Sequence, residues 1–297
     1  MKTASYVTAF SFFSLMFLFP NNSYSQITMD LTVLDDQISI NDLSKEVKMS
    51  FGKDRRANPK HAKQRGMIAT GLAPKFEDNV SCRGIDDYWA MDYSKKRGRE
   101  AYHGGIDIPA PKGTSILAVA SGVVVAKYMN EQNPKGIEIV IRHSPKDTGL
   151  SFWTYTQYTH LKQMPDLKIG QRINMGDVIG QTSNTGMSGR QARAKHGSSG
   201  RKERSGSFTK IRRNALHLGA IYSDTKKYAK NEKMLIPKNA YWMDPNALYK
   251  KEAPYDSHSL KKLSNNEKQI SIPYMLDSGE IIPKDTKVIW PYTCKKR

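Results

Sequence analysis

A histidine and an aspartate lie four residues apart in the segment His103-Gly104-Gly105-Ile106-Asp107. An imidazole and a carboxylate are both zinc ligands, and zinc in proteins is usually four-coordinate. The two glycines and the proline at position 109 disfavour a helix here. On a strand, side chains two residues apart share a face, so residues 103 and 107 would point the same way. The segment predicts part of a metal site on a strand, although so short a pattern also arises by chance.

Further short segments follow in order along the chain and carry histidine, aspartate and glycine-rich turns. They are Tyr158-Thr159-His160-Leu161, Gly176-Asp177-Val178-Ile179-Gly180, Ser183-Asn184-Thr185-Gly186, Ala215-Leu216-His217-Leu218 and Asp244-Pro245. Each segment alone is a weak signal, because short motifs recur by chance. Their order and intervals together are the informative feature.

In this order the segments resemble the lysostaphin/LytM-type zinc metallopeptidases, which cut peptidoglycan peptides. The resemblance covers residues 80 to 250, more than half of the chain. It implies that His103, Asp107 and His217 bind one Zn²⁺. It implies that His160 is catalytic, because the matching histidine assists the catalytic water and stabilises the tetrahedral intermediate. The fold that it implies is a mainly antiparallel β-sheet domain with a narrow groove over the zinc site.

The chemistry of these residue types agrees with the resemblance. Two imidazoles and one carboxylate leave a fourth zinc position for water, as in catalytic rather than structural sites. A nearby histidine that is not a ligand can move protons or stabilise charge. A structural role for His160 is the alternative. His143 also ends a candidate strand, and we expect it to be structural.

The chain departs from the family at the motif His-x-His, which here is Ala215-Leu216-His217. Residues 215 and 217 of a strand share a face, so Ala215 should lie beside the metal where the family has a second catalytic histidine. The implied ligand set is intact, but half of the acid–base pair is missing. His196, in a long insertion, could substitute for it, although an exposed loop histidine with no role is the simpler interpretation.

The elements that position these residues are predicted to be short strands. Residue patterns typical of β-strands occur at 113–126, 136–143, 152–161, 175–181 and 215–222. Glycine turns, and no long amphipathic helix, lie between them. Residues 188–213 hold nine Lys or Arg residues and one Glu, which predicts a flexible basic loop bordering the groove. Outside the domain, 27–34, 270–275 and 287–292 are candidate strands, and 53–65 is a candidate basic linker.

The ends of the chain predict export and a four-part organisation. Lys2, the apolar stretch 7–20 and the small residues 23–25 are typical of a signal peptide that is cleaved before Gln26. The apolar stretch is short for a membrane anchor, and we expect no transmembrane segment after cleavage. We therefore expect a signal peptide (1–25), a basic N-terminal extension (26–80), the catalytic domain (81–250) and a C-terminal tail (251–297), with both extensions irregular.

The charge and the cysteine content indicate which binding partners and which cellular compartment to expect. Without residues 1–25 the chain has 46 basic and 28 acidic residues, a formal charge of +18. Such a field favours polyanions, and export makes anionic envelope polymers better candidates than nucleic acid, for which no aromatic–basic module is present. Cys82 and Cys294 are the two cysteines. An even count in an exported chain predicts a disulfide, with two free thiols as the alternative.

These observations predict an exported zinc endopeptidase, periplasmic or extracellular, that hydrolyses peptide bonds in peptidoglycan during cell-wall remodelling or lysis. Ala215 predicts that it is slow. The alternative is a catalytically degenerate peptidoglycan-binding protein or an activator of another cell-wall hydrolase. Retention of all three implied zinc ligands favours the enzyme, since a pure binding module needs no metal.

Overall fold

A computed structural model describes residues 28–52, 58–85, 92–96, 99–130, 135–186 and 214–297. Within these ranges most regular structure is β-strand, and the longest helix is α1 (Lys45–Phe51). No helix of the described ranges is long and apolar enough to cross a bilayer. The predicted signal peptide (1–25) and basic loop (188–213) lie outside the described residues.

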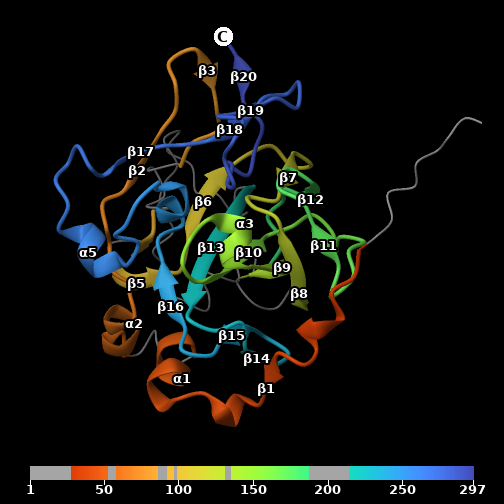
Figure 1. The fold of residues 1–297 in the computed structure, drawn as a ribbon, viewed down its shortest axis with the longest axis vertical. Coiled ribbons are helices and arrows are strands. Elements are labelled where there is room, and N and C mark those ends of the chain that lie inside the picture. Colours follow the sequence, from red (N-terminus) through yellow and green to blue (C-terminus); the bar gives the residue numbers. More distant parts are fainter. Residues whose placement is uncertain (1–27, 53–57, 86–91, 97–98, 131–134, 187–213) are drawn as a thin grey trace, which may run out of the picture.

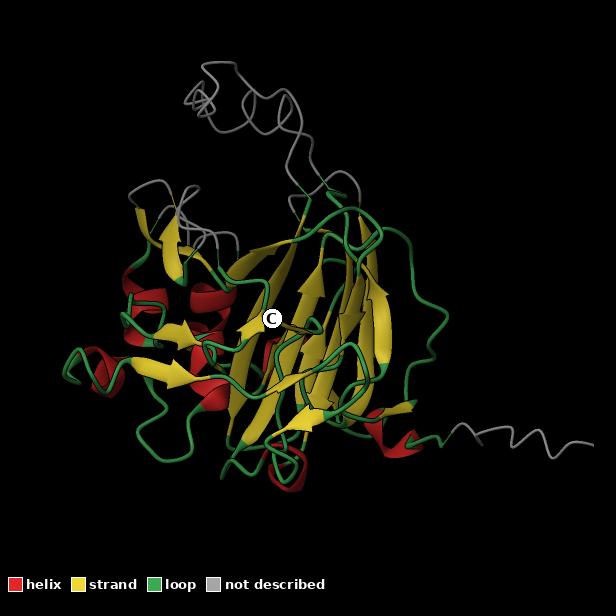
Figure 2. Ribbon diagram, turned by 90° about the horizontal axis from the view of Figure 1, so that it is seen from above, coloured by secondary structure: helices red, strands yellow, loops and turns green. Residues whose placement is uncertain are grey.

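A seven-stranded antiparallel sheet forms the centre of the protein (Figures 1 and 2). Its strands are β11 (Arg172–Ile173), β8 (Gly122–Asn130), β9 (Gly136–His143), β10 (Trp153–Thr159), β13 (Ala215–Ser223), β16 (Tyr241–Met243) and β6 (Ile106–Pro109). The first six follow one another in that spatial order, and β6 pairs with β13. On one edge β13 therefore meets β6 along its first half and β16 along its second half, while its other edge pairs with β10. This confirms the predicted mainly β, antiparallel fold.

Both faces of the central strands are covered, which is unusual because antiparallel sheets often expose one face to water. All eight residues of β9 are buried, including three polar ones, and each of these has a partner. Glu138 pairs with Lys135 at 2.7 Å, and Arg142 pairs with Asp36 at 2.7 Å. His143 bonds through both ring nitrogens. Buried polar groups of this kind destabilise a fold unless they are paired, and here they are.

Shorter elements surround the central sheet. The other strands are β1 (Gln37–Ile38), β2 (Ala73–Lys75), β3 (Val80–Ser81), β4 (Ser94–Lys96), β5 (Arg99–His103), β7 (Ser115–Leu117), β12 (Val178–Gln181), β14 (Tyr228–Lys230), β15 (Leu235–Pro237), β17 (Gln269–Ser271), β18 (Tyr274–Met275), β19 (Ile281–Ile282) and β20 (Lys295–Lys296). The helices are α1, α2 (Lys60–Gln64), α3 (Pro145–Thr148) and α5 (Ser257–Lys261), with 3-10 turns η1 (Leu31–Val33), η2 (Ile40–Asp42) and η5 (Pro245–Tyr249).

The N-terminal extension packs onto the sheet rather than lying apart from it. β1 pairs in parallel with β14, and Asp36 forms the ion pair with Arg142 of β9. The Phe51 ring of α1 stacks on Trp242 of β16, with ring centroids 4.3 Å apart. Helices α1 and α2 lie with β1 at one end of the molecule (Figure 1). Burial of apolar side chains from α1 and α2 against the sheet accounts for this docking.

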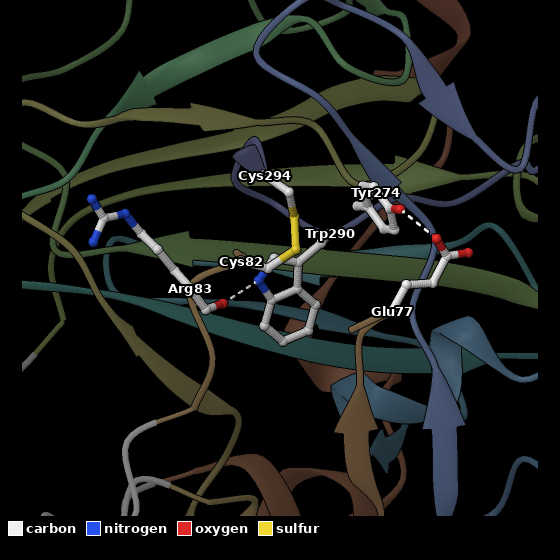
Figure 3. The surroundings of a disulfide bond; sticks show 6 residues. All are labelled: Glu77, Cys82, Arg83, Tyr274, Trp290 and Cys294. Atoms are coloured by element: carbon white, nitrogen blue, oxygen red, sulfur yellow. Dashed lines mark hydrogen bonds between the residues drawn. A yellow bond between two sulfur atoms is a disulfide. The ribbon is translucent and has the colours of Figure 1, made fainter. Parts of the chain in front are cut away.

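The C-terminal tail is fixed at the opposite end, where β20 pairs with β3 (Figure 1). Cys82 and Cys294 form a disulfide across 212 residues, which confirms the predicted bond. Beside it, the indole N–H of Trp290 donates to the Arg83 carbonyl at 2.6 Å (Figure 3). Trp290 is fully buried and belongs to the same apolar core as the central sheet. The tail is thus an integral layer of the fold.

Several local expectations are wrong outside the central sheet. The described part of 27–34 forms the 3-10 turn η1 rather than a strand, and part of the candidate linker 53–65 forms α2. Ala62 of α2 is fully buried, so docking of its small apolar side chain overrides the basic texture around it. Residues 287–292 form no strand, although Trp290 and Tyr292 are buried. Tertiary packing, rather than local propensity, decides these segments.

Candidate metal centre and active site

The site is built on the pairing of β6 with β13. Asp107 of β6 is the register partner of His217 of β13. Residues directly opposite each other on antiparallel strands have side chains on the same face, about 5 Å apart at their Cβ atoms. The His217 Nδ1 atom accordingly lies 2.7 Å from the Asp107 Oδ1 atom. The sheet register alone brings together two groups that are 110 residues apart in sequence.

His103 reaches the same point from a separate strand. It is the last residue of β5, and β6 begins only at Ile106. The expectation that residues 103 and 107 share one strand is therefore wrong. A sharp bend at Gly104 and Gly105 separates the two strands. A Cβ atom on Gly105 would lie 2.2 Å from the Leu218 carbonyl oxygen and 2.9 Å from the His217 Nε2 atom.

Three potential ligand atoms converge at this bend. The His103 Nε2 atom lies 3.0 Å from the Asp107 Oδ1 atom and 3.0 Å from the His217 Nδ1 atom. The three residues form a cluster whose ligand atoms all lie within 4.8 Å of one another. His103 and Asp107 are buried, and the His217 side chain is 14% exposed. The three residues predicted as zinc ligands are thus brought together, with a face open at His217.

The protonation of His103 suits a metal ligand. Its Nδ1 atom lies 2.8 Å from the Asp92 backbone carbonyl oxygen, which can only accept a hydrogen bond. Nδ1 therefore carries a proton, and in the neutral form of the ring the Nε2 lone pair faces Asp107 and His217. A backbone carbonyl that orients a histidine in this way is common behind metal-binding histidines. Two imidazole nitrogens and a carboxylate oxygen in contact fit a divalent cation such as Zn²⁺.

His160 lies at the side of this cluster. It follows the last residue of β10, and its backbone has a φ of 65°, in the left-handed region that non-glycine residues rarely adopt. Its ring centroid lies 6.0 Å from that of His217. The Nδ1 atom lies 3.1 Å from the Thr185 carbonyl oxygen. The structure therefore places His160 within reach of a group bound at the cluster without placing it among the three clustered residues.

Ala215 is the first residue of β13 and pairs with Pro109. Because it lies two residues before His217, its side chain is on the same face of the strand. Ala215 is buried and supplies no group that can donate or accept a proton. His196 lies outside the described residues.

His143 is separate from the cluster. Its Nδ1 atom lies 2.7 Å from the Ser121 carbonyl oxygen, and its Nε2 atom lies 2.7 Å from the Thr156 hydroxyl. Burial lowers the pKa of His143 to about 4, so the ring is neutral near pH 7. A neutral ring that is bonded at both nitrogens inside the sheet fits the structural role expected for this residue.

Sequence reasoning missed the residues that hold the site together. The Asp92 and Thr185 carbonyls act through the backbone, so no residue-type pattern identifies them. Asp244 belongs to the segment Asp244-Pro245, for which the sequence predicts no role. It is fully buried, accepts from the Thr70 hydroxyl and from the Asn246 N–H, and begins the turn η5. Burial, with a smaller contribution from the Asp92 charge, raises the pKa of Asp244 to about 7.

Known proteins share the segment that carries this site. An uncharacterized metalloprotease of Buchnera aphidicola is 38% identical over 86 residues, 29% of this chain and 20% of that protein. The peptidoglycan DD-endopeptidase ShyC of Vibrio cholerae is 38% identical over 90 residues, 30% of this chain and 18% of that protein. The matches thus span about a fifth of these relatives.

Among solved structures, a mutant catalytic domain of the prophage-encoded M23 protein EnpA from Enterococcus faecalis is similar at 20% identity. That match covers 55% of this chain and 96% of that domain, with a TM-score of 0.33. Residues 101–196 match the model of Peptidase family M23, and this segment includes His103, Asp107 and His160. The segment 101–196 thus matches peptidase family M23, as the resemblance of the motifs predicted.

Proposed function

We propose that this protein is an exported zinc endopeptidase that hydrolyses peptide bonds in peptidoglycan. The observation that carries the proposal is the convergence of His103 Nε2, Asp107 Oδ1 and His217 Nδ1 within one buried cluster. The M23 match and the name of the ShyC relative support peptidoglycan peptides as the substrate class.

Each residue of the site has a proposed role. His103, Asp107 and His217 hold the zinc ion. Zinc in such a site supplies Lewis acidity, which polarises the scissile carbonyl and makes a water molecule more acidic. His160 moves a proton or stabilises developing charge at the reacting carbonyl. Ala215 contributes no proton donor, so His160 acts alone unless His196 assists.

Export is supported by the predicted signal peptide (1–25) and by the disulfide, since disulfides persist mainly in oxidising compartments. Periplasmic or extracellular residence follows. Fractionation of cells that express the full chain tests this. The mature protein should begin at Gln26 and be found outside the cytoplasm. An unprocessed cytoplasmic chain would refute export.

The basic loop (188–213) is proposed to attract anionic envelope polymers beside the groove. Attraction between exposed charges weakens with salt, because the Debye length falls from about 10 Å at 0.1 M to about 3 Å at 1 M. Deletion of 188–213 should weaken binding to cell-wall sacculi at low salt and leave zinc content unchanged. Binding to sacculi that changes neither with the deletion nor with the salt concentration would contradict this role.

The second candidate function is a binding protein or activator of another hydrolase, and the observation that favours it is Ala215. The two are separated by incubating purified, zinc-loaded protein with purified peptidoglycan and analysing the released peptides by mass spectrometry. New peptide termini that increase with time support the enzyme. Binding without cleavage, at full zinc occupancy, supports the second function.

A further inference from the structure

The segment Ser183–Gly186 joins the three strand ends around the site. The Ser183 carbonyl accepts from the Ala215 N–H at 3.1 Å, which ties the segment to the start of β13. The Thr185 hydroxyl accepts from the Ile137 N–H at 3.2 Å and donates to the Leu161 carbonyl at 2.7 Å. These bonds tie it to β9 and to the chain just after β10. Ala215 lies in the strand that carries His217, and Leu161 directly follows His160.

The same segment meets the ring of His160. The Thr185 carbonyl lies 3.1 Å from the His160 Nδ1 atom, while the His160 backbone N–H donates to the Lys135 carbonyl at 3.1 Å. A carbonyl can only accept, so Nδ1 carries a proton, and in the neutral form of the ring Nε2 is then the basic nitrogen. The strained backbone of His160 (φ 65°) needs surrounding contacts to persist.

Gly136 shows how closely the segment is pressed against β9. A Cβ atom on Gly136 would lie 2.4 Å from the Gly186 nitrogen and 2.6 Å from the Thr185 carbonyl oxygen. Gly136 also has a φ of 64°. Gly279 has a similar backbone conformation, φ 87°, with no atom within 4 Å of a Cβ. The chain thus offers a control that shares the backbone strain but not the collision.

We propose that Thr185 is a positioning residue, whose hydroxyl pins its own carbonyl against the His160 Nδ1 atom and so holds the neutral ring in the tautomer that carries its proton on Nδ1. The inference rests on the proposed peptidase function for its catalytic consequence. The tautomer itself is independent of that function. Thr185 touches no reacting atom in this scheme, and it acts through His160.

The test compares the mature wild type with four variants, and a fifth, His160→Ala, serves to assign the signals. Thr185→Val keeps the shape of the side chain but removes both hydroxyl bonds, and Thr185→Ser restores the hydroxyl. Gly136→Ala displaces the segment by collision, with Gly279→Ala as its control. Long-range ¹H–¹⁵N spectra of the histidine rings report the tautomer, with the His160 signals identified by their loss in His160→Ala.

In the wild type we expect His160 to be protonated at Nδ1. Thr185→Val and Gly136→Ala should move the ring toward a mixture of tautomers, while Thr185→Ser and Gly279→Ala keep the wild-type signature. With a soluble cross-linked peptide as substrate, Thr185→Val should lower kcat about 10- to 100-fold and leave KM within about twofold of the wild-type value. Small displacements of a catalytic group have effects of this size. Zinc content should stay the same in all variants.

An Nε2–H tautomer in the wild type would overturn the proposal without recourse to any variant. Unchanged spectra and kinetics in Thr185→Val would also overturn it. The wild type could cleave no peptide while Thr185→Val still loses the Nδ1–H tautomer. That result would uphold the positioning role of Thr185 and refute the peptidase function. Failure of the two hypotheses can therefore be told apart.

Discussion

The contacts around His103, Asp107 and His217 show which kind of group the three side chains are arranged to bind. The His103 Nδ1–H donates to the Asp92 carbonyl, so in the neutral ring the Nε2 atom presents a lone pair. A lone pair 3.0 Å from another imidazole nitrogen and from a carboxylate oxygen favours a cation among them. At the residue scale the cluster is therefore arranged for a positive ion.

Replacing His217 by Ala should abolish zinc binding, because two ligands rarely hold zinc against water. The mature wild type should contain about one zinc per chain. His258→Ala is a suitable control, since this histidine is exposed on α5. Metal analysis after dialysis measures the result. Full zinc occupancy in His217→Ala would contradict the ligand assignment.

Ala215→His should raise the rate of peptidoglycan hydrolysis, because it places a second imidazole on the face of β13 that carries His217. One positioned acid–base group typically contributes about 10²–10⁴ in rate, and a gain near the lower end is expected in a buried position. Release of soluble peptides measures it, and His160→Ala should remove the remaining wild-type activity.

Three outcomes of the peptide-release measurement distinguish the hypotheses on how the site works. Weak wild-type activity that rises in Ala215→His supports a slow enzyme. Activity only in the variant supports a binding protein with an intact metal site. Brisk wild-type activity that is lost in His196→Ala would show that the insertion supplies the missing group.

At the scale of elements, β9 buries the polar side chain of His143 completely. His143 is neutral in the folded protein because burial lowers its pKa from about 6.5 to about 4. Between these values the unfolded chain binds more protons than the folded one. His143 therefore makes the free energy of unfolding fall as pH decreases from about 6.5 to about 4. The pKa of Asp244, raised to about 7, gives a slope of opposite sign in an overlapping range.

His143→Gln removes one of these two slopes and leaves the other. The fall of the His143 pKa from about 6.5 to about 4 corresponds to about 3 kcal/mol, so the rise in unfolding free energy from pH 4 to 6.5 should be smaller by about that amount in the variant. Urea unfolding at several pH values measures it. The comparison concerns slopes, so a general loss of stability in the variant does not affect it. Parallel pH curves would show that His143 does not titrate as described.

At the scale of the whole molecule, extensions from both ends of the sequence hold the central sheet. The N-terminal part reaches β9 through Asp36 and β16 through Phe51. The C-terminal part is closed by the disulfide next to buried Trp290 (Figure 3). The core cluster contains residues of all three parts, so they should unfold together.

Removing the disulfide should lower the free energy of unfolding by a few kcal/mol. Chain entropy predicts about 5 kcal/mol for a loop of this length, and measured effects are often smaller. Urea unfolding of Cys82→Ser/Cys294→Ser against the wild type tests it. Reductant should destabilise the wild type and have no effect on the double variant. Two reactive thiols per unfolded, unreduced chain would rule the bond out.

The sequence by itself determined the strand content of the central sheet, the resemblance to a metallopeptidase and the identity of the clustered residues. These depend on local signals, such as alternating apolar residues, glycine turns and short motifs, that remain readable without contacts. The cysteine pairing was also predictable, because only one pair is possible. The domain boundaries at 80 and 250, and the roles of the site residues, stay predictions.

Tertiary structure alone decided how the site is assembled. The bend at Gly104 and Gly105 separates His103 from Asp107, and position 105 requires glycine because the carbonyl of Leu218 leaves no room for a Cβ atom. The register of β6 against β13 sets the distance between Asp107 and His217, and the Thr185 carbonyl sets the tautomer of His160. Packing in three dimensions also makes the C-terminal tail part of the core, through buried Trp290. Contacts between residues about a hundred positions apart depend on the whole packed chain, which no local pattern encodes.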